Sequence, residues 1–478
     1  MGILIKEHIA YTLTLSEDPV YVALNKQEAL LRTPDIKVIP RIFKTERGRD
    51  YSCFHCHTSE KQIELYSGYF VGIDWLTQDR YIHIEPKLNT EIAASFDLVS
   101  NSEEVSDQTE EALSNEAKER IKKSTSYKEV DVIAVLMELM SHPEAAKHTN
   151  NLLLIDWEMP EISITQKQDL LTPFLVVRFL KLLQDIVKKG LKKSYYKVEE
   201  NLRNKIKGKI LVGQQIKQNI FKNRFTNTVC EYQIFGEDSI ENRFLKKVFV
   251  FCTQYIENNT PYFKNQNNIA WLINYIRPAL EHISTDVDIW DIKHLKYNPF
   301  FKEYKDAIKV GQHILKRFSY NITRATTELA STPPFWIDMP RMFELYCYVQ
   351  LLKANPEAGQ QIKYQFSTYG NALDILIAKP DSEMIIDAKY KLHYRTGKVH
   401  QDIRQVSGYA RLQKVRSELK IEDDRNIDCL IIYPDMENGI EDLNSFNLES
   451  IKALLDNPRN QITAYHKVFK LGLKLPHK

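Results

Sequence analysis

Two aspartates and a lysine in the last third of the chain have the residue types and spacing of a hydrolytic metal site. Asp374 lies in an apolar run at 372–378, and Asp387 and Lys389 end a second such run. The segment Lys379-Pro-Asp-Ser382 between the runs predicts a turn and therefore a β-hairpin. A turn centred between its proline and its aspartate places Asp374 opposite Asp387, and Lys389, two positions on, projects to the same face as Asp387. We therefore expect the three side chains to converge.

Such a group of side chains fits one kind of chemistry. Two carboxylates roughly 5 Å apart repel each other, and a hard divalent cation removes that penalty. Oxygen ligands suit Mg²⁺, and a lysine beside the cation can hold or polarise an attacking water. The pattern predicts metal-assisted hydrolysis of a phosphodiester. The alternative is a solvent-exposed hairpin whose polar face carries Asp and Lys by simple alternation.

Two predicted helices flank this hairpin and add candidate side chains. The segment 338–352 has apolar residues at helical spacing and carries Glu344 among them, either as a further acid or as a charge at the edge of the helix face. The segment 402–410 predicts a second helix, on which Gln405 and Tyr409 share one face. These two helices and the hairpin are the elements that must position the site.

The composition is that of an ordinary globular protein. The chain has 478 residues, 43% hydrophobic and 27% charged, and a net charge of +2. This length favours about three domains, and the composition excludes a disordered tail, a collagen and a disulfide scaffold.

Several signals are missing from the sequence. We find no secretory signal and no run of about 18 apolar residues that would cross a membrane, and six sparse cysteines suit a reducing compartment. We expect a cytoplasmic protein without membrane contact. The phosphate loop of NTPases is missing too, so any nucleotide hydrolysis would come from another protein. Cys53, Cys56 and His57 lack a second ligand pair at zinc-like spacing, and we favour a thiol-rich turn there.

The first two thirds of the chain divide by patterning. Residues 1–92 are rich in predicted strands, including a hairpin from 70–76 and 81–85. The stretch 97–116 has seven acidic and no basic residues, which predicts a solvated insertion or linker. Strong helical periodicity then runs from Thr172 to about Lys189 and ends at Gly190.

Residues 188–224 carry 12 Lys or Arg against 2 Glu, with aromatic residues interleaved. One interpretation is a phosphate-contacting face for nucleic acid. The other is the solvated side of helices, balanced elsewhere by the acidic stretch. The candidate contacts to DNA are Lys192, Lys193, Arg203, Lys205, Lys207 and Lys209.

The order of the candidate residues resembles a known superfamily. A helix with Glu344, then Asp374, then Asp387-x-Lys389, then a helix with Gln405 is similar to the PD-(D/E)XK nucleases. The segments 337–344, 386–391 and 402–410 together resemble McrC, the nuclease subunit family of McrBC-type restriction systems. Weaker similarities include 68–72, 82–87, 189–195 and 237–244, so the resemblance spans most of the chain except the acidic stretch near 97–125, which looks like an insertion.

The resemblance implies a Mg²⁺-dependent DNA endonuclease subunit, with Mn²⁺ as a substitute metal. Asp374, Asp387 and the carbonyl of Ala388 would hold the ion, Lys389 would stabilise the attacking water or the developing charge, and Glu344 and Gln405 would assist. McrC proteins pair with McrB, an AAA+ GTPase motor, dock on its ring through their N-terminal region and stimulate its GTPase. GTP would therefore act only through the partner, and the substrate would be double-stranded, modified DNA.

These inferences define an expected architecture. We expect a multidomain α+β and α/β protein with a β-rich partner-docking region at 1–165, a basic, mainly helical region at 166–330 and a PD-(D/E)XK domain at 331–478. Two other functions stay open: a non-cleaving adaptor that activates an AAA+ GTPase, and a standalone nuclease that acts on another nucleic acid such as RNA.

Overall fold

The computed structural model describes most of the chain outside the acidic stretch. The described residues are 2–6, 10–14, 20–24, 27–31, 42–44, 50–58, 62–76, 81–86, 88–89, 127–128, 130–149, 152–165, 169–263, 267–287, 292, 302–318, 329–368, 371–390, 396–436, 438–441, 446–462 and 464–477. The predicted insertion at 97–116 lies outside them.

The chain divides into two compact units. The first combines Met1–Ile162 with Thr332–Lys478, and the second is Ser163–Ser331. The dividing points lie beside the boundaries expected at 165 and 330, but the N-terminal and C-terminal segments count as one unit. The division into three functional domains stays a prediction.

A five-stranded sheet joins the two ends of the chain within the first unit. Its order is β1 (Gly2–Lys6), β10 (Tyr81–Glu85), β9 (Phe70–Trp75), β19 (Phe335–Asp338) and β13 (Leu153–Ile155). β9 and β10 pair antiparallel, which confirms the hairpin predicted over 70–76 and 81–85. β19 approaches β9 so closely that a Cβ on Gly72 would lie 2.1 Å from the carbonyl oxygen of Phe335, so only glycine fits there.

Shorter strand pairs make up the rest of the described N-terminal segment. They are β2-β8-β7 (Ala10–Thr14, Gln62–Ser67, Phe54–Thr58), β3-β4 (Val20–Leu24, Gln27–Leu31), β5-β6 (Ile42–Lys44, Asp50–Ser52) and β11-β12 (Leu88–Asn89, Tyr127–Lys128). Cys56 and His57 therefore lie on a paired strand rather than in the predicted thiol-rich turn. Cys53 is buried.

The helix α11 (Met339–Ala354) follows β19 directly and confirms the helix predicted over 338–352. Its start is fixed because Oδ1 of Asp338 accepts a hydrogen bond from the backbone N–H of Arg341 at 3.1 Å. The helix α3 (Val132–Ser141) packs against α11, and Glu138 of α3 accepts a hydrogen bond from Lys353 Nζ at 2.6 Å. A short helix, α4 (Pro143–Ala146), follows α3.

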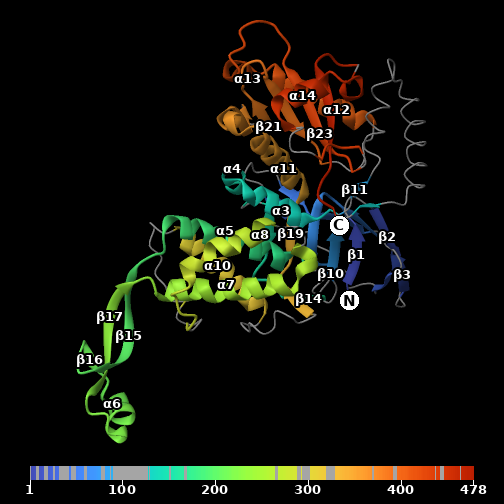
Figure 1. The fold of residues 1–478 in the computed structure, drawn as a ribbon. Helices are drawn as coiled ribbons and strands as arrows, with labels where there is room; N and C mark the ends of the chain where they lie inside the picture. Colours follow the sequence, from blue (N-terminus) through green and yellow to red (C-terminus); the bar gives the residue numbers. More distant parts are fainter. Residues whose placement is uncertain are drawn as a thin grey trace. The chain divides into compact units, whose positions relative to one another are not determined.

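A second sheet, with five strands, forms the C-terminal part of the first unit, where Figure 1 labels β21 and β23. Its order is β20 (Ile362–Thr368), β21 (Asn371–Ile377), β22 (Met384–Ala388), β23 (Asp428–Pro434) and β24 (Val468–Leu473). The first three strands are antiparallel, and β22, β23 and β24 are parallel. Parallel neighbours need crossover connections, which here carry α12 (Thr396–Ala410), α13 (Gln413–Glu418) and α14 (Leu448–Leu455).

Helices pack against this sheet and bury its strands. Ile403 and Val406 of α12 form one apolar cluster with Leu376 of β21 and Ile385 of β22. The helix α11 packs against β20 and β22, and its Tyr348 ring stacks on a tyrosine of β20. As a result, all five residues of β22 are buried.

The described part of the second unit has a helical body. Its longer helices are α5 (Leu171–Lys189), α7 (Ile240–Asn258), α8 (Asn267–Leu280) and α10 (Lys302–Arg317), and β14 (Ile162–Thr165) and β18 (Leu329–Thr332) pair near its two ends. The C-terminus predicted for α5 is confirmed, because Gly190 follows it with a φ of +91° that favours glycine.

A long β-hairpin projects from this helical body (Figure 1). It consists of β15 (Ser194–Arg203) and β17 (Asn227–Gly236), with the short strand β16 (Lys209–Ile210), the helix α6 (Val212–Gln218) and the 3₁₀ turn Ile220–Lys222 between them. Most of the basic segment 188–224 therefore belongs to the hairpin. The interpretation of this basic segment as the solvated side of helices is therefore wrong for β15. The middle region at 166–330, which the sequence predicted to be mainly helical, also includes a sheet.

Within the described ranges, the structure contains no helix with both the length and the apolar character needed to cross a membrane.

Candidate active site

The candidate site lies where the pairing of β21 with β22 ends. The ladder joins Ile377 to Met384, Leu376 to Ile385 and Ile375 to Ile386, which is the register predicted from the turn. The next rung would pair Asp374 with Asp387. Instead, Oδ2 of Asp374 accepts a hydrogen bond from the backbone N–H of Ala388 at 2.9 Å. This bond fixes the Asp374 carboxylate beside the end of β22.

Asp387 and Lys389 are in direct contact at this position. Lys389 Nζ lies 2.8 Å from Oδ2 of Asp387 and donates a hydrogen bond to Oε1 of Gln405 at 3.2 Å. Gln405 Nε2 in turn donates to the hydroxyl of Tyr409 at 2.9 Å, which confirms that these two residues of α12 share one face. Asp387 is only 2% exposed. The alternative of a solvent-exposed polar hairpin face is therefore wrong for this residue.

Glu344 of α11 is held from the neighbouring strand β20. Its Oε2 accepts hydrogen bonds from Gln365 Nε2 at 3.2 Å and from the hydroxyl of Tyr364 at 3.4 Å. Sequence reasoning missed both donors, because the segment 362–368 shows neither a catalytic spacing nor a turn signal. Only the packing of α11 against β20 brings them to Glu344.

The carboxylates of the site influence one another electrostatically. Burial raises the pKa of Asp374 well above its ordinary value, and the charges of Glu344 and Asp387 raise it further. Burial also raises the pKa of Glu344, together with the charges of Asp338 and Asp387. Burial alone would lower the pKa of Lys389, but the adjacent charges of Asp387 and Asp374 outweigh burial and raise it. The lysine is therefore a fixed cation among three carboxylates.

The oxygen atoms of this site suit a small hard cation. Asp374 and Asp387 supply carboxylate oxygens, and Ala388 supplies a backbone carbonyl at the same strand end. Among the described residues there is no group of three or more His, Cys, Asp and Glu side chains placed to hold a metal ion. A cation here would therefore rest on two carboxylates and a backbone oxygen, with water or phosphate oxygens completing its shell, which is a usual arrangement for Mg²⁺.

The six candidate DNA contacts divide between the two ends of the projecting hairpin. At its root, Lys192 forms an ion pair with Glu241, and Lys193 Nζ lies 3.5 Å from Oε1 of Glu237. Lys192 therefore serves the fold of the hairpin root. The part of the hairpin between the end of β15 and the start of β17 is called its far half here. The other four candidates are exposed in this far half, and they are Arg203, Lys205, Lys207 and Lys209.

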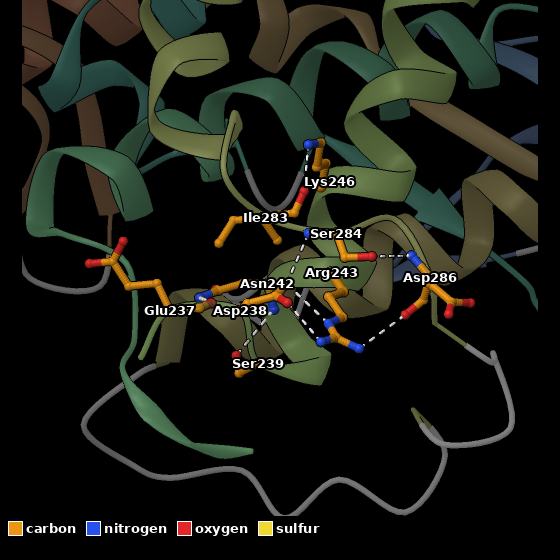
Figure 2. Close-up of polar contacts among 9 residues, drawn as sticks. All are labelled: Glu237, Asp238, Ser239, Asn242, Arg243, Lys246, Ile283, Ser284 and Asp286. Carbon is orange, nitrogen blue, oxygen red and sulfur yellow. Dashed lines mark hydrogen bonds and ion pairs between the residues drawn. The ribbon is translucent and has the colours of Figure 1, made fainter. Parts of the chain in front are cut away.

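A polar network ties the root of the hairpin to the helical body (Figure 2). Arg243 of α7 donates two hydrogen bonds to Asp238, from Nε to Oδ1 at 3.0 Å and from Nη2 to Oδ2 at 2.7 Å. Asn242 Nδ2 donates to the carbonyl oxygens of Lys192 and Glu237, at 3.0 and 2.6 Å. These contacts hold the chain both before β15 and after β17, so the hairpin leaves the body at a fixed root.

The far half of the hairpin is apolar as well as basic. Phe221 and Phe225 are 77% and 75% exposed, and Ile206 and Val212 are 67% and 64% exposed. Large exposed apolar side chains gathered in one region mark interaction surfaces. The basic charge of this segment is evident from the sequence. That its apolar side chains stay exposed, and do not pack into a hydrophobic core, is evident only from the structure.

Comparisons with known proteins identify a family. The family model described as "McrBC 5-methylcytosine restriction system component" matches residues 70–434. A comparison with curated proteins gives no significant match.

Two solved structures are similar to the chain over most of its length. One is a half-complex from a tetradecameric assembly of Thermococcus gammatolerans McrB AAA+ hexamers with bound McrC, with 14% identity, a TM-score of 0.31 and coverage of 84% of this chain and 85% of that chain. The other is a Thermococcus gammatolerans McrBC complex solved by cryo-electron microscopy, with 12% identity, a TM-score of 0.26 and coverage of 85% and 98%.

Proposed function

This chain belongs to the family of McrBC 5-methylcytosine restriction system components, and on that premise we propose that it is the DNA-cleaving subunit of such a system. The observation that carries the proposal is the convergence of Asp374, Asp387 and Lys389 at the end of β22. The element order adds support, since a helix with Glu344 precedes the hairpin and a helix with Gln405 follows it. That order is the one on which the resemblance to PD-(D/E)XK nucleases rests.

Asp374, Asp387 and the carbonyl oxygen of Ala388 would hold Mg²⁺, or Mn²⁺ in its place. The bound cation would supply Lewis-acid activation of the phosphate and of the attacking water. Three carboxylates accompany one lysine in this partly buried site, so a divalent cation would also offset their mutual repulsion.

The chain's own side chains orient the reactants. Lys389 is held by Asp387 and Gln405, so its ammonium group has a fixed direction. From there it donates to the attacking water or to the phosphate oxygen on which negative charge develops. Glu344, fixed by its two donors on β20, accepts a hydrogen bond from the water.

The proposed partner is a ring-forming AAA+ GTPase of the McrB type. The family description names a component of a restriction system, and this sequence contains no phosphate loop of its own. GTP would be hydrolysed by the partner, and the substrate would be double-stranded DNA that carries modified cytosine. The basic and apolar far half of the hairpin is the surface that we assign to partner binding, in addition to the N-terminal region expected from the sequence.

Two alternatives give different outcomes in one experiment. Methylated plasmid, unmethylated plasmid and an RNA substrate are each incubated with this chain and Mg²⁺, with and without the motor partner and GTP, and the Asp387→Ala variant is the control. We expect cutting of methylated plasmid by the wild type and none by Asp387→Ala, although the variant stays folded and still stimulates the GTPase. Stimulation without cutting by the wild type would indicate the adaptor. Cutting of RNA without the motor would indicate the standalone nuclease.

A further inference from the structure

The strand β20 contains one irregular residue, and that residue faces the candidate site. Tyr364 pairs with Ile375, and Phe366 pairs with Leu373. In the same register Gln365 would pair with Asp374, but this one pair is missing from the ladder. Gln365 has a φ of +50°. This left-handed conformation is unfavourable for a residue with a Cβ atom, and such residues gather at functional sites.

The irregularity reverses the faces of the strand. Tyr364 stacks on Tyr348 of α11, with ring centroids 5.1 Å apart, whereas Phe366 packs against the apolar cluster that contains Ile403 of α12. Residues two apart on a regular strand point to the same face. The ring of Tyr364 contacts α11, whereas the ring of Phe366 lies 5.6 Å from Nζ of Lys414 on α13, so the alternation is shifted by one residue at Gln365.

This shift has a consequence for Glu344. Adjacent residues of a regular strand point to opposite faces, yet Tyr364 and Gln365 both donate to Oε2 of Glu344, at 3.4 and 3.2 Å. With regular backbone at Gln365, its amide would point away from α11. The left-handed conformation is therefore what brings a second donor to the carboxylate.

A bend alone would not need this side chain. Glycine adopts a positive φ without steric cost, and asparagine does so more readily than glutamine. Glutamine adds an amide long enough to reach α11, and that amide is in hydrogen-bond contact with an acidic residue of the site.

We propose that Gln365 is a positioning residue, whose left-handed backbone aims its amide at Glu344 and so fixes the rotation of that carboxylate toward the metal and water site. The inference rests on the proposed nuclease function, since it gives Glu344 its orientation in that reaction. In this role Gln365 acts through Glu344.

Two substitutions separate the effect of the Gln365 side-chain amide from the effect of its backbone conformation. Gln365→Gly keeps the positive φ and removes the amide, and Gln365→Asn tolerates the positive φ but has a shorter amide. Lys420→Gly is the matched control, because Lys420 is an exposed non-glycine residue of the same unit with a φ of +56°. Each variant is tested as the full chain for Mg²⁺ affinity by titration calorimetry, for thermal stability, and for plasmid cleavage with the motor and GTP.

We expect Gln365→Gly and Gln365→Asn to keep the wild-type melting temperature but to lower Mg²⁺ affinity or the cleavage rate by about tenfold. Lys420→Gly should match the wild type in all three measurements. Wild-type affinity and cleavage in both Gln365 variants would show that the residue is only a bend, and would overturn the inference. If the wild type binds Mg²⁺ but cuts no DNA, the nuclease proposal fails, and the affinities still decide the role of Gln365. If the wild type neither binds Mg²⁺ nor cuts DNA, the nuclease proposal and the inference about Gln365 are both overturned.

Discussion

Lys389 Nζ lies 2.8 Å from Oδ2 of Asp387, two positions earlier in the chain. The regular strand ends at Ala388, and the backbone N–H of Lys389 donates to the carbonyl oxygen of Ile432 on the parallel neighbour β23 at 2.8 Å. The lysine is thus held at both its backbone and its side chain. A catalytic ammonium group benefits from such rigidity, because its direction does not have to be ordered during the reaction.

Replacement of Lys389 should impair cleavage more than replacement of Gln405, which holds its ammonium group. Lys389→Met removes the charge that we propose acts on the reacting phosphate, and we expect plasmid cleavage to fall by about 10²- to 10³-fold. Gln405→Met removes only the second contact of Nζ, so the loss should be about tenfold. Cleavage rates with saturating motor and GTP measure both effects. A larger loss in Gln405→Met than in Lys389→Met would contradict this order.

The far half of the hairpin should be needed for partner binding but not for folding. Phe221 and Phe225 are mostly exposed, so the double change Phe221→Ser and Phe225→Ser should leave the melting temperature unchanged. We expect the affinity for the motor subunit to fall by about tenfold or more, because exposed aromatic residues dominate binding energy when they are buried at an interface. Trp271→Ser, at a 55% exposed position on α8, is the matched control. Equal loss in the control would indicate a nonspecific effect.

His83 should make the first unit sensitive to acid. Burial lowers the pKa of His83 to about 4 from an ordinary value of 6.5, and its two ring nitrogens have no hydrogen-bond partner among the described residues. The unfolded chain therefore binds a proton near pH 6.5 that the folded chain takes up only near pH 4. The free energy of unfolding should fall as the pH falls through this window, by at most about 3 kcal/mol.

The variant His83→Leu tests this acid sensitivity. Because leucine does not titrate, we expect its free energy of unfolding to decrease less between pH 7 and pH 5 than that of the wild type, as measured by urea denaturation. Parallel pH profiles for the two proteins would assign the acid sensitivity to other groups.

Arg317 should stabilise the helical body of the second unit. Its Nη2 lies 2.7 Å from Oδ1 of Asp169, and the two side chains are 1% and 0% exposed. Arg317→Met leaves a buried carboxylate without its counter-charge, so we expect a loss of about 3–5 kcal/mol in the free energy of unfolding.

The second variant is the double change Arg317→Met and Asp169→Asn, which removes the charge but keeps an acceptor for the backbone N–H groups of Leu171 and Thr172. It should recover part of the loss in chemical denaturation. A single variant within about 1 kcal/mol of the wild type would show that the pair contributes little.

Features that depend on neighbouring residues could be predicted from the sequence. The turn at Lys379–Ser382 set the register of β21 and β22, because a short turn leaves few ways to pair its flanking strands. Asp338 set the start of α11, and Gly190 set the end of α5, through local hydrogen bonds and backbone conformation.

Features that join distant segments depend on tertiary packing and could not be predicted in this way. The pairing of β9 with β19 brings residues 70–75 beside 335–338 and makes the two ends of the chain one unit. Gln365 adopts its left-handed backbone where β20 meets α11, and no local pattern at 362–368 predicts it. Periodicity records which face of an element is apolar, but not which distant element covers that face. For this reason the hairpin register that brings Asp374 to the end of β22 could be predicted from the sequence, whereas the hydrogen bonds that hold Glu344 could not.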